Sequence, residues 1–240
     1  MAKNEVTKKK ETYMTANDQQ MCMGFADDLG AEDMDRTFIQ LVHPQSKVVK
    51  EKKIMPGSLI RSSDNEVLAT QGGDPFEFYL VGGHNYWVVK DGPTHTANYI
   101  EKKPGLTEND YDFNFKRGEN PEGHHYFFHR AYVVIPKGET IPMEYSCRNS
   151  GNKDAKRFNK QIKLLAQGGT PSWGKVFTMT VEDKSNKDNE WLGVTFGVGR
   201  DTTEEEQVLI RKAWEEFRNS KEEWLKMNTE STDTEQEVEY

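Results

Sequence analysis

The sequence predicts a mainly β (α+β) protein, a barrel or sandwich with one basic amphipathic helix and a C-terminal helix. Runs of alternating apolar and polar residues recur between Gly- and Pro-rich turns, a pattern that indicates about eight to ten short strands. One segment, Ser150–Gly168, instead repeats its apolar residues at helical spacing. Strand-rich segments flank that helix and do not alternate with helices, so a βαβ layout is excluded.

The composition indicates a packed domain with unpacked ends. At 240 residues the chain can bury a core without disulfides, yet only 34% of its residues are hydrophobic and its mean hydropathy is −0.89. We expect a flexible basic arm at residues 1–20, a domain with an N-terminal extension at residues 21–227, and a disordered acidic tail at residues 228–240. The net charge of −8 comes from residues 201–240, because residues 1–200 hold equal numbers of acids and bases.

The segment before the helix is rich in strand patterns. Candidate strands are FIQLVH at 38–43, KVVKEKKIM at 47–55, SLIRSS at 58–63 and EVLAT at 66–70, with a turn between the last two. FEFYLVGGHNYWVVKDG predicts two strands joined at Gly82-Gly83, which is a hairpin signal. The polar segment that follows, to about Gly123, predicts a long loop with a short strand at 111–115.

A long strand is expected from His124 to Pro136, with large side chains on both faces. One face interleaves aromatic residues with a cation and comprises Tyr126, Phe128, Arg130, Tyr132 and Val134. We expect this face to be the less suited of the two to a core. The segment IPMEYSCR at 141–148 then returns as a strand into the helix.

The helix Ser150–Gly168 divides into an apolar arc about 100° wide and a basic arc opposite it. The apolar arc comprises Ala155, Phe158, Ile162, Leu165 and Ala166. The basic arc comprises Lys153, Lys156, Arg157, Lys160 and Lys163. Between Arg148 and Lys175 seven bases stand against one acid. A solvated helix face usually mixes both signs, whereas an unmixed cationic arc suits a polyanion.

Two more strands and a terminal helix follow. WGKVFTMTVED and EWLGVTFGVGR both alternate, and in the second strand the core face comprises Leu192, Val194, Phe196 and Val198. Trp191 then lies on the face opposite the core. Thr202 or Thr203, followed by Glu205 or Glu206, predicts a capping box, so a helix should run from about Glu204 to Met227.

No catalytic residue, metal site or cofactor is predicted. The motifs of serine hydrolases, zinc proteases and P-loop nucleotide-binding proteins are missing. His125 and His129 would lie about 13 Å apart along a strand, too far to share an ion. Cys22 and Cys147 have no partner at zinc spacing and are expected to be reduced.

The sequence also predicts a cytoplasmic protein without membrane contact. It has no apolar run long enough to cross a bilayer, and MAKNEVTKKKE at the N-terminus lacks the apolar region of an export signal.

The functional signal that remains is a surface that combines cations with aromatic rings. Binding of single-stranded nucleic acid without sequence preference uses aromatic platforms along a basic groove. The candidate DNA-binding residues are Arg130, Arg148, Lys153, Lys156, Arg157, Lys160, Lys163, Lys175, Tyr126, Phe128, Tyr132, Tyr145, Trp173 and Trp191. Each aromatic taken singly is more often a core residue, so the hypothesis depends on the set. A protein-interaction or assembly role, with the basic helix as a docking face, stays open, as does binding of RNA or duplex DNA.

The order of segments resembles phage-encoded single-stranded DNA-binding proteins of the OB-fold type. The resemblance runs from about Pro75 to Trp224 and is carried by PMEYSCRNS, Ala-Lys-Arg-Phe near the helix start, PSWGKVF, a polar turn, a Trp-bearing strand and an acidic helix. It implies an OB-like β-barrel that coats and protects single-stranded DNA during replication, recombination or repair in the host cytoplasm. The segment Lys3–Lys53 departs from a minimal OB barrel and is a candidate for either an extra subdomain or a homodimer element.

The acidic tail carries the second part of the resemblance. Residues 228–240 have five acids and no base and end on Tyr240, as the acidic tails of this group end on an aromatic residue. The resemblance implies that the tail docks replication or recombination proteins and competes with DNA for the basic groove. The candidate partner-binding residues are Glu235, Glu237, Glu239 and Tyr240.

Overall fold

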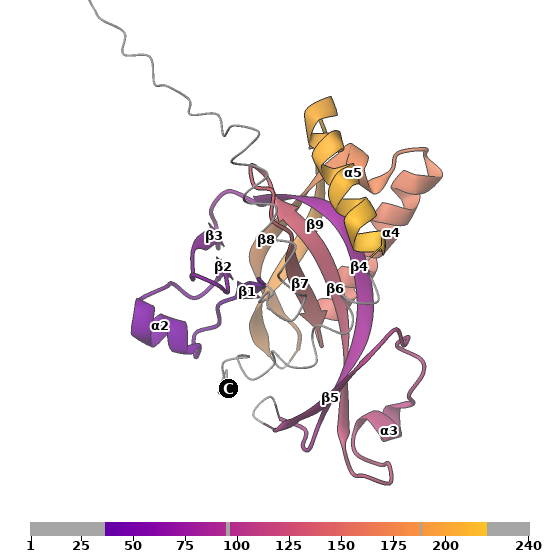
Figure 1. The fold of residues 1–240 in the computed structure, drawn as a ribbon. Coiled ribbons are helices and arrows are strands. Elements are labelled where there is room, and N and C mark those ends of the chain that lie inside the picture. Colours follow the sequence, from indigo (N-terminus) through magenta and orange to yellow (C-terminus); the bar gives the residue numbers. More distant parts are fainter. Residues whose placement is uncertain (1–36, 95–96, 188, 220–240) are drawn as a thin grey trace, which may run out of the picture. The chain divides into compact units, whose positions relative to one another are not determined.

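Two antiparallel sheets and a few helices make up the fold, in the computed structural model drawn in Figure 1. The structure describes residues 37–94, 97–187 and 189–219. The small sheet has the order β1 (Ile39–Leu41), β2 (Ser58–Arg61) and β3 (Val67–Thr70). The mainly β class predicted from the sequence is therefore confirmed. The arm at 1–20, residues 21–36 and the tail at 228–240 lie outside the described residues.

The large sheet has the strand order β7-β6-β4-β8-β9, and β5 pairs with β4 off this path. Its strands are β4 (Phe76–Lys90), β5 (Tyr99–Pro104), β6 (His125–Pro136), β7 (Met143–Arg148), β8 (Lys175–Ser185) and β9 (Glu190–Asp201). The sheet curls, because the ring of Tyr145 on β7 and that of Phe196 on β9 are 5.9 Å apart although their strands end the path on opposite sides. In the described part of the chain no backbone pairing joins β7 to β9, so a closed barrel is not found.

The strand predicted at 47–55 is wrong, because helix α2 (Lys47–Lys52) lies there. The backbone N–H of His43 donates to Ser46 Oγ at 3.0 Å, just before the helix begins. Val48 then packs against Val42, which follows β1, and against Ile60 of β2. Packing of one helical face onto the sheet overrides the β preference of the two valines.

The hairpin predicted at Gly82-Gly83 is also wrong, because β4 is one strand that pairs with β6 along its length, from Phe78 to Lys90. The register shifts between Leu80 and Gly82, so the glycines lie at a bulge. A Cβ on Gly82 would overlap the ring of Phe217, which packs there from the C-terminal helix. Gly82 therefore makes room for a helix, and the glycine pair does not form a turn.

The segment between β4 and β6 differs from the predicted loop in two places. Strand β5 extends the sheet, with Lys103 opposite Trp87. The predicted strand at 111–115 is wrong, because helix α3 (Phe113–Lys116) lies there. Asp112 caps this helix, its Oδ1 accepting from the backbone N–H of Phe115 at 2.7 Å.

The main core lies between the curled sheet and helix α4 (Gly151–Gln167). Phe158 of α4 is fully buried at its centre, and its ring lies 4.5 Å from that of Phe196 and 5.2 Å from that of Phe177. Burial of one such side chain stabilises the fold by about 1.5–3 kcal/mol. Leu192, Val194 and Phe196 of β9 face this core as predicted, but Val198 is 39% exposed.

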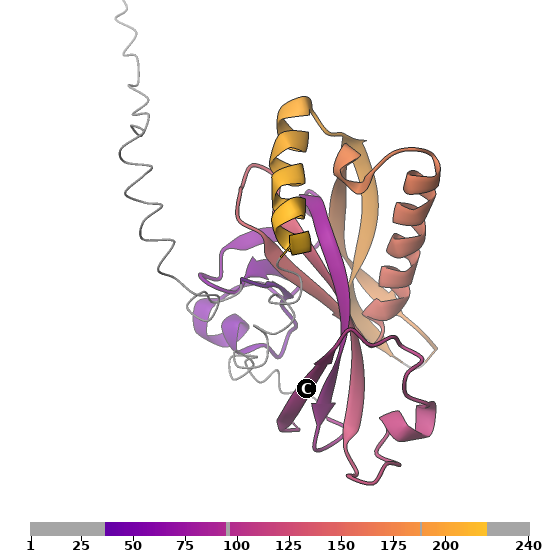
Figure 2. The same ribbon diagram turned by 45° about the vertical axis from the view of Figure 1, so that its right-hand side comes forward.

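Helix α5 (Glu204–Asn219) covers the opposite face of the sheet. It packs Ile210, Ala213 and Phe217 onto alternate residues of the strands, including Tyr79 and Val133, so α4 and α5 lie on different sides, as Figure 2 shows. The predicted helix is confirmed up to Asn219, and residues 220–227 lie outside the described residues.

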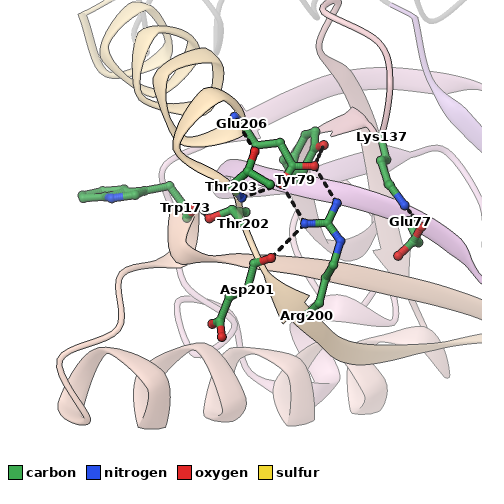
Figure 3. Close-up of polar contacts among 9 residues, drawn as sticks. All are labelled: Glu77, Tyr79, Lys137, Trp173, Arg200, Asp201, Thr202, Thr203 and Glu206. Carbon is green, nitrogen blue, oxygen red and sulfur yellow. Dashed lines mark hydrogen bonds and ion pairs between the residues drawn. The ribbon is translucent and has the colours of Figure 1, made fainter.

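The predicted capping box fixes the start of α5. The backbone N–H of Thr203 donates to Glu206 Oε2 at 2.8 Å, and the N–H of Glu206 donates to Thr203 Oγ1 at 3.3 Å. Figure 3 shows that the guanidinium of Arg200 also donates two hydrogen bonds to the Glu206 carboxylate, at 2.8 and 2.6 Å. The hydroxyl of Tyr79 donates a third to the same carboxylate at 2.6 Å. The hydrogen bond from Arg200 lowers the pKa of Glu206 to about 2. Burial, together with the hydrogen bond to Glu206, raises the pKa of Tyr79 to about 12.

Candidate nucleic-acid interface

Helix α4 has the bounds and the buried face that its sequence predicts. It follows Ser150 and ends at Gly168, whose backbone N–H donates to the carbonyl of Leu164 at 3.0 Å. Ala155 and Phe158 of the apolar arc are fully buried, and Ile162 and Leu165 pack partly against the same core. Ala166 is the exception and is exposed, as is most of the last turn of the helix.

The opposite side of α4 carries a row of exposed cations, which we call the basic row. It comprises Lys153, Lys156, Arg157, Lys160 and Lys163. The one acid of this helix, Asp154, is buried, and its carboxylate accepts from Lys184 of β8 at 2.6 Å. Since Lys184 already balances Asp154, that acid offsets little of the charge of the basic row.

Three cations of the basic row have no ion pair within the described ranges: Lys153, Lys160 and Lys163. Arg157 reaches Asp154 only at 3.5 Å, with its side chain 68% exposed. An exposed pair of this length contributes little to stability. Folding therefore gives no reason for this concentration of positive charge.

One carboxylate ties the N-terminal end of α4 to the loop before α3. Glu108 Oε2 accepts from Arg130 of β6 at 2.6 Å and from Lys156 at 2.8 Å. Burial alone would raise the pKa of Glu108, but the bonds from Lys156 and Arg130 outweigh it and the pKa is lowered. Glu108 is thus an anion held between two candidate DNA-binding cations.

Arg130 serves the fold and is not free to bind phosphate, which corrects its assignment. It is buried, its guanidinium lies 4.6 Å from the centre of the Phe128 ring, and it also donates to Asn152 Oδ1 at 2.8 Å. Its charge is balanced by Glu108, as a buried charge requires.

The two tyrosines Tyr132 and Tyr145 belong to the main core, so their prediction as base-stacking residues is wrong. The hydroxyl of Tyr132 donates to the carbonyl of Ala155 at 3.1 Å, and burial raises its pKa. Both rings stand edge-on to Phe196. These side chains fill the space between the sheet and α4, as strand aromatics usually do.

Tyr126 and Phe128 are buried as well, at 7% exposure each, so neither ring offers a free face for stacking. They form an aromatic cluster with Trp87, onto which Tyr111 and Phe115 of the α3 segment pack. The face of β6 that interleaves aromatics and Arg130 is therefore covered by the chain itself. The alternating pattern of β6 does not reveal this cover, because the covering segment folds back onto the strand from the weakly patterned loop before it.

The two candidate tryptophans occupy different places. Trp191 is half-buried on β9 and pairs in register with Lys184, the partner of Asp154 on α4. Trp191 is therefore the candidate aromatic residue whose cross-strand neighbour, Lys184, contacts α4. Trp173 is half-buried near α5, where its ring lies 5.4 Å from that of Trp214.

Of the remaining candidate cations, Lys175 pairs with Asp201 at 2.7 Å, and Arg148 is half-buried at the end of β7. The α4 cations thus lie together on one helix, whereas Trp173 packs against Trp214 of α5. The tail residues Glu235, Glu237, Glu239 and Tyr240 lie outside the described residues.

Phe113, which the sequence pattern does not single out, is 67% exposed on α3, and the guanidinium of Arg117 lies 5.1 Å from its ring centre. The signal in the sequence was Asp112 placed three residues before Phe115, the spacing of a helix cap. The same segment was predicted as a strand, and Glu108 was overlooked with it.

No group of three metal-ligating side chains lies within reach of one ion anywhere in the described ranges. Cys147 is free and buried in the core, and burial raises the pKa of its thiol. Cys22 lies outside the described residues. Among the described residues, no helix is both long enough and apolar enough to span a bilayer.

Comparison of the chain with protein-family models, with curated proteins and with solved structures gives no match.

Proposed function

We propose that this chain is a non-catalytic protein that binds single-stranded DNA without sequence preference and protects it during replication, recombination or repair. The observation that carries the proposal is the basic row of α4. Five exposed cations lie along one helix whose only acid is buried and paired elsewhere. A concentrated, weakly neutralised row of this kind gains free energy from phosphates, because each contact releases condensed counterions.

The strand order favours an OB-like barrel as the scaffold of this binding surface. Four long strands and β7 follow one curled path. In sequence, α4 lies between β7 and β8. An OB fold is a five-stranded, partly open barrel whose surface binds oligonucleotides. The contact between Tyr145 and Phe196 across the core brings the two ends of the path toward each other, as such a barrel requires.

The chemistry of the row favours a flexible strand over a lipid surface. Most of the apolar arc of α4 packs on the protein core, with Phe158 and Ala155 fully buried and Ile162 and Leu165 partly buried. An interfacial helix needs that arc free to enter the lipid. The tail at 228–240, with its five acids, is proposed to recruit replication or recombination proteins and to compete with DNA for the row.

The test is to measure the binding of labelled oligo(dT) by fluorescence anisotropy across a range of salt concentrations. We expect log K to fall linearly with log salt. The combined replacement Lys153→Glu, Lys160→Glu and Lys163→Glu should abolish binding, and the corresponding Ala variant should reduce the salt slope by about 2, since each phosphate contact contributes about 0.7 for a single strand.

The matched control is Lys50→Glu, Lys52→Glu and Lys53→Glu, which changes the net charge equally at three exposed lysines on or just after α2. This control should keep most of the affinity. Equal loss in both variants would assign the effect to net charge alone, and no loss in the α4 variant would refute the proposal. Competition by duplex DNA and by RNA, and cleavage of the probe with Mg²⁺, test the alternative binding and nuclease functions.

A further inference from the structure

Phe113 and Arg117 form an exposed pair of a flat ring and a cation on the α3 segment. With 67% of its surface accessible, Phe113 is the single aromatic among the strongly exposed large apolar residues of the described ranges. The Arg117 guanidinium lies 5.1 Å from the centre of its ring, which leaves much of the ring surface open. The pair therefore presents both parts of a nucleotide-binding surface, a π-face and a positive charge.

The segment that carries the pair is held firmly on the aromatic cluster of β4 and β6. The rings of Tyr111 and Phe115 lie 4.6 and 5.0 Å from that of Tyr126. The side-chain amide of Asn120 donates to the carbonyl of Phe115 at 2.9 Å, and Asp112 caps the helix from the other end. A ring on such a support loses little conformational freedom when a base stacks on it.

The pair is linked to the basic row through Glu108. Lys116, which lies between the two residues of the pair, donates to the carbonyl of Glu108 at 2.9 Å. The carboxylate of Glu108 holds Lys156 of the basic row at 2.8 Å. Figures 1 and 2 both place α3 on the side of the molecule that carries α4. The pair and the row are therefore connected by contacts through Glu108.

We infer that Phe113 and Arg117 are a base-stacking subsite for single-stranded nucleic acid, in line with the phosphate-binding row on α4. This inference rests on the proposed function. In it the strand lays its phosphates along α4 and one base on the open surface of Phe113, while Arg117 stays against the ring and neutralises the adjoining phosphate. The subsite replaces the platform expected from Tyr126 and Phe128, which are buried.

The experiment compares oligo(dT) with an abasic oligonucleotide of the same length, because the two strands share phosphates and differ only in bases. Phe113→Ala should bind oligo(dT) about tenfold more weakly, the loss expected for one stacked base. The same variant should bind the abasic strand as the natural protein does. Phe113→Trp should restore the affinity, and its added indole fluorescence should be quenched by oligo(dT).

The control is Val208→Ala on α5, a residue that is 71% exposed and lies on the helix covering the other face of the sheet. It should leave both affinities unchanged. If the natural protein binds neither strand, the proposed function fails. If it binds oligo(dT) and Phe113→Ala changes nothing, or weakens both strands equally, the stacking subsite is wrong while the proposed function stands.

Discussion

Glu108 illustrates at the residue scale how one side chain decides what its neighbours can do. It holds Arg130 and Lys156 with the same oxygen, and its side chain is 35% exposed. Arg130 is buried and needs this anion, whereas Lys156 is exposed and can exchange it for a phosphate. The same ion cluster therefore contains one structural cation and one that can serve binding.

Glu206 gives a prediction at this scale. Glu206→Gln should lower the free energy of unfolding by about 1–2 kcal/mol at neutral pH, the range for charge-assisted bonds at a partly exposed site. The folded pKa is lowered from 4.5 to about 2, so the contribution is complete above pH 4.5 and is lost as the pH falls toward 2. Urea denaturation at several pH values measures the free energy of unfolding of the natural protein and of Glu206→Gln.

The stability difference between the natural protein and Glu206→Gln should therefore shrink as the pH falls from 4.5 toward 2. Glu205→Gln is the control, because it removes the same charge from the same helical turn at an exposed residue. A gap that stays constant with pH would contradict the assigned role of the Arg200 and Glu206 pair.

At the scale of the element, β4 and α5 show why a glycine pair need not be a turn. The sequence pattern at Gly82-Gly83 fits a hairpin, yet the strand continues through a bulge because β6 pairs with it on both sides. What selects glycine at position 82 is the ring of Phe217, contributed by a helix more than a hundred residues later in the chain. Local sequence carries no sign of that contact.

Gly82→Ala should destabilise the protein by about 1–3 kcal/mol, since the added methyl group overlaps the Phe217 ring in a packed region. The thermal midpoint measured by circular dichroism tests this change. In a Phe217→Ala background the same substitution should have a smaller effect, because the ring is gone. Equal effects in both backgrounds would show that Phe217 is not the reason for the glycine.

At the scale of the whole molecule, charge is separated along the chain. Residues 201–240 carry the entire net charge of −8, while the segment from Arg148 to Lys175 is strongly positive. Opposite charges on one chain attract each other over distances of about 10 Å at 0.1 M salt. We therefore propose that an external polyanion competes with the chain's own acids for the basic row.

Deletion of residues 228–240 should tighten oligo(dT) binding several-fold at low salt, because five acids are removed from the chain. Anisotropy titrations with the full and the shortened chain measure the change, which should fade as salt rises. Replacing the five acids by their amides, with the tail length kept, should give the same result. Unchanged affinity in both variants would exclude competition by the tail.

The sequence by itself determined the elements whose pattern is local and strong. The bounds of α4, its buried Phe158 and exposed cations, the strands β6 to β9 and the capping box of α5 follow from periodicity and capping. Only the tertiary structure decided which rings are free and which cations are paired. Tyr132 is buried because α4 covers it, Arg130 is neutralised because a distant loop brings Glu108, and Phe113 is exposed because α3 turns it outward. These properties arise from contacts between residues far apart in sequence, and a local pattern cannot encode them.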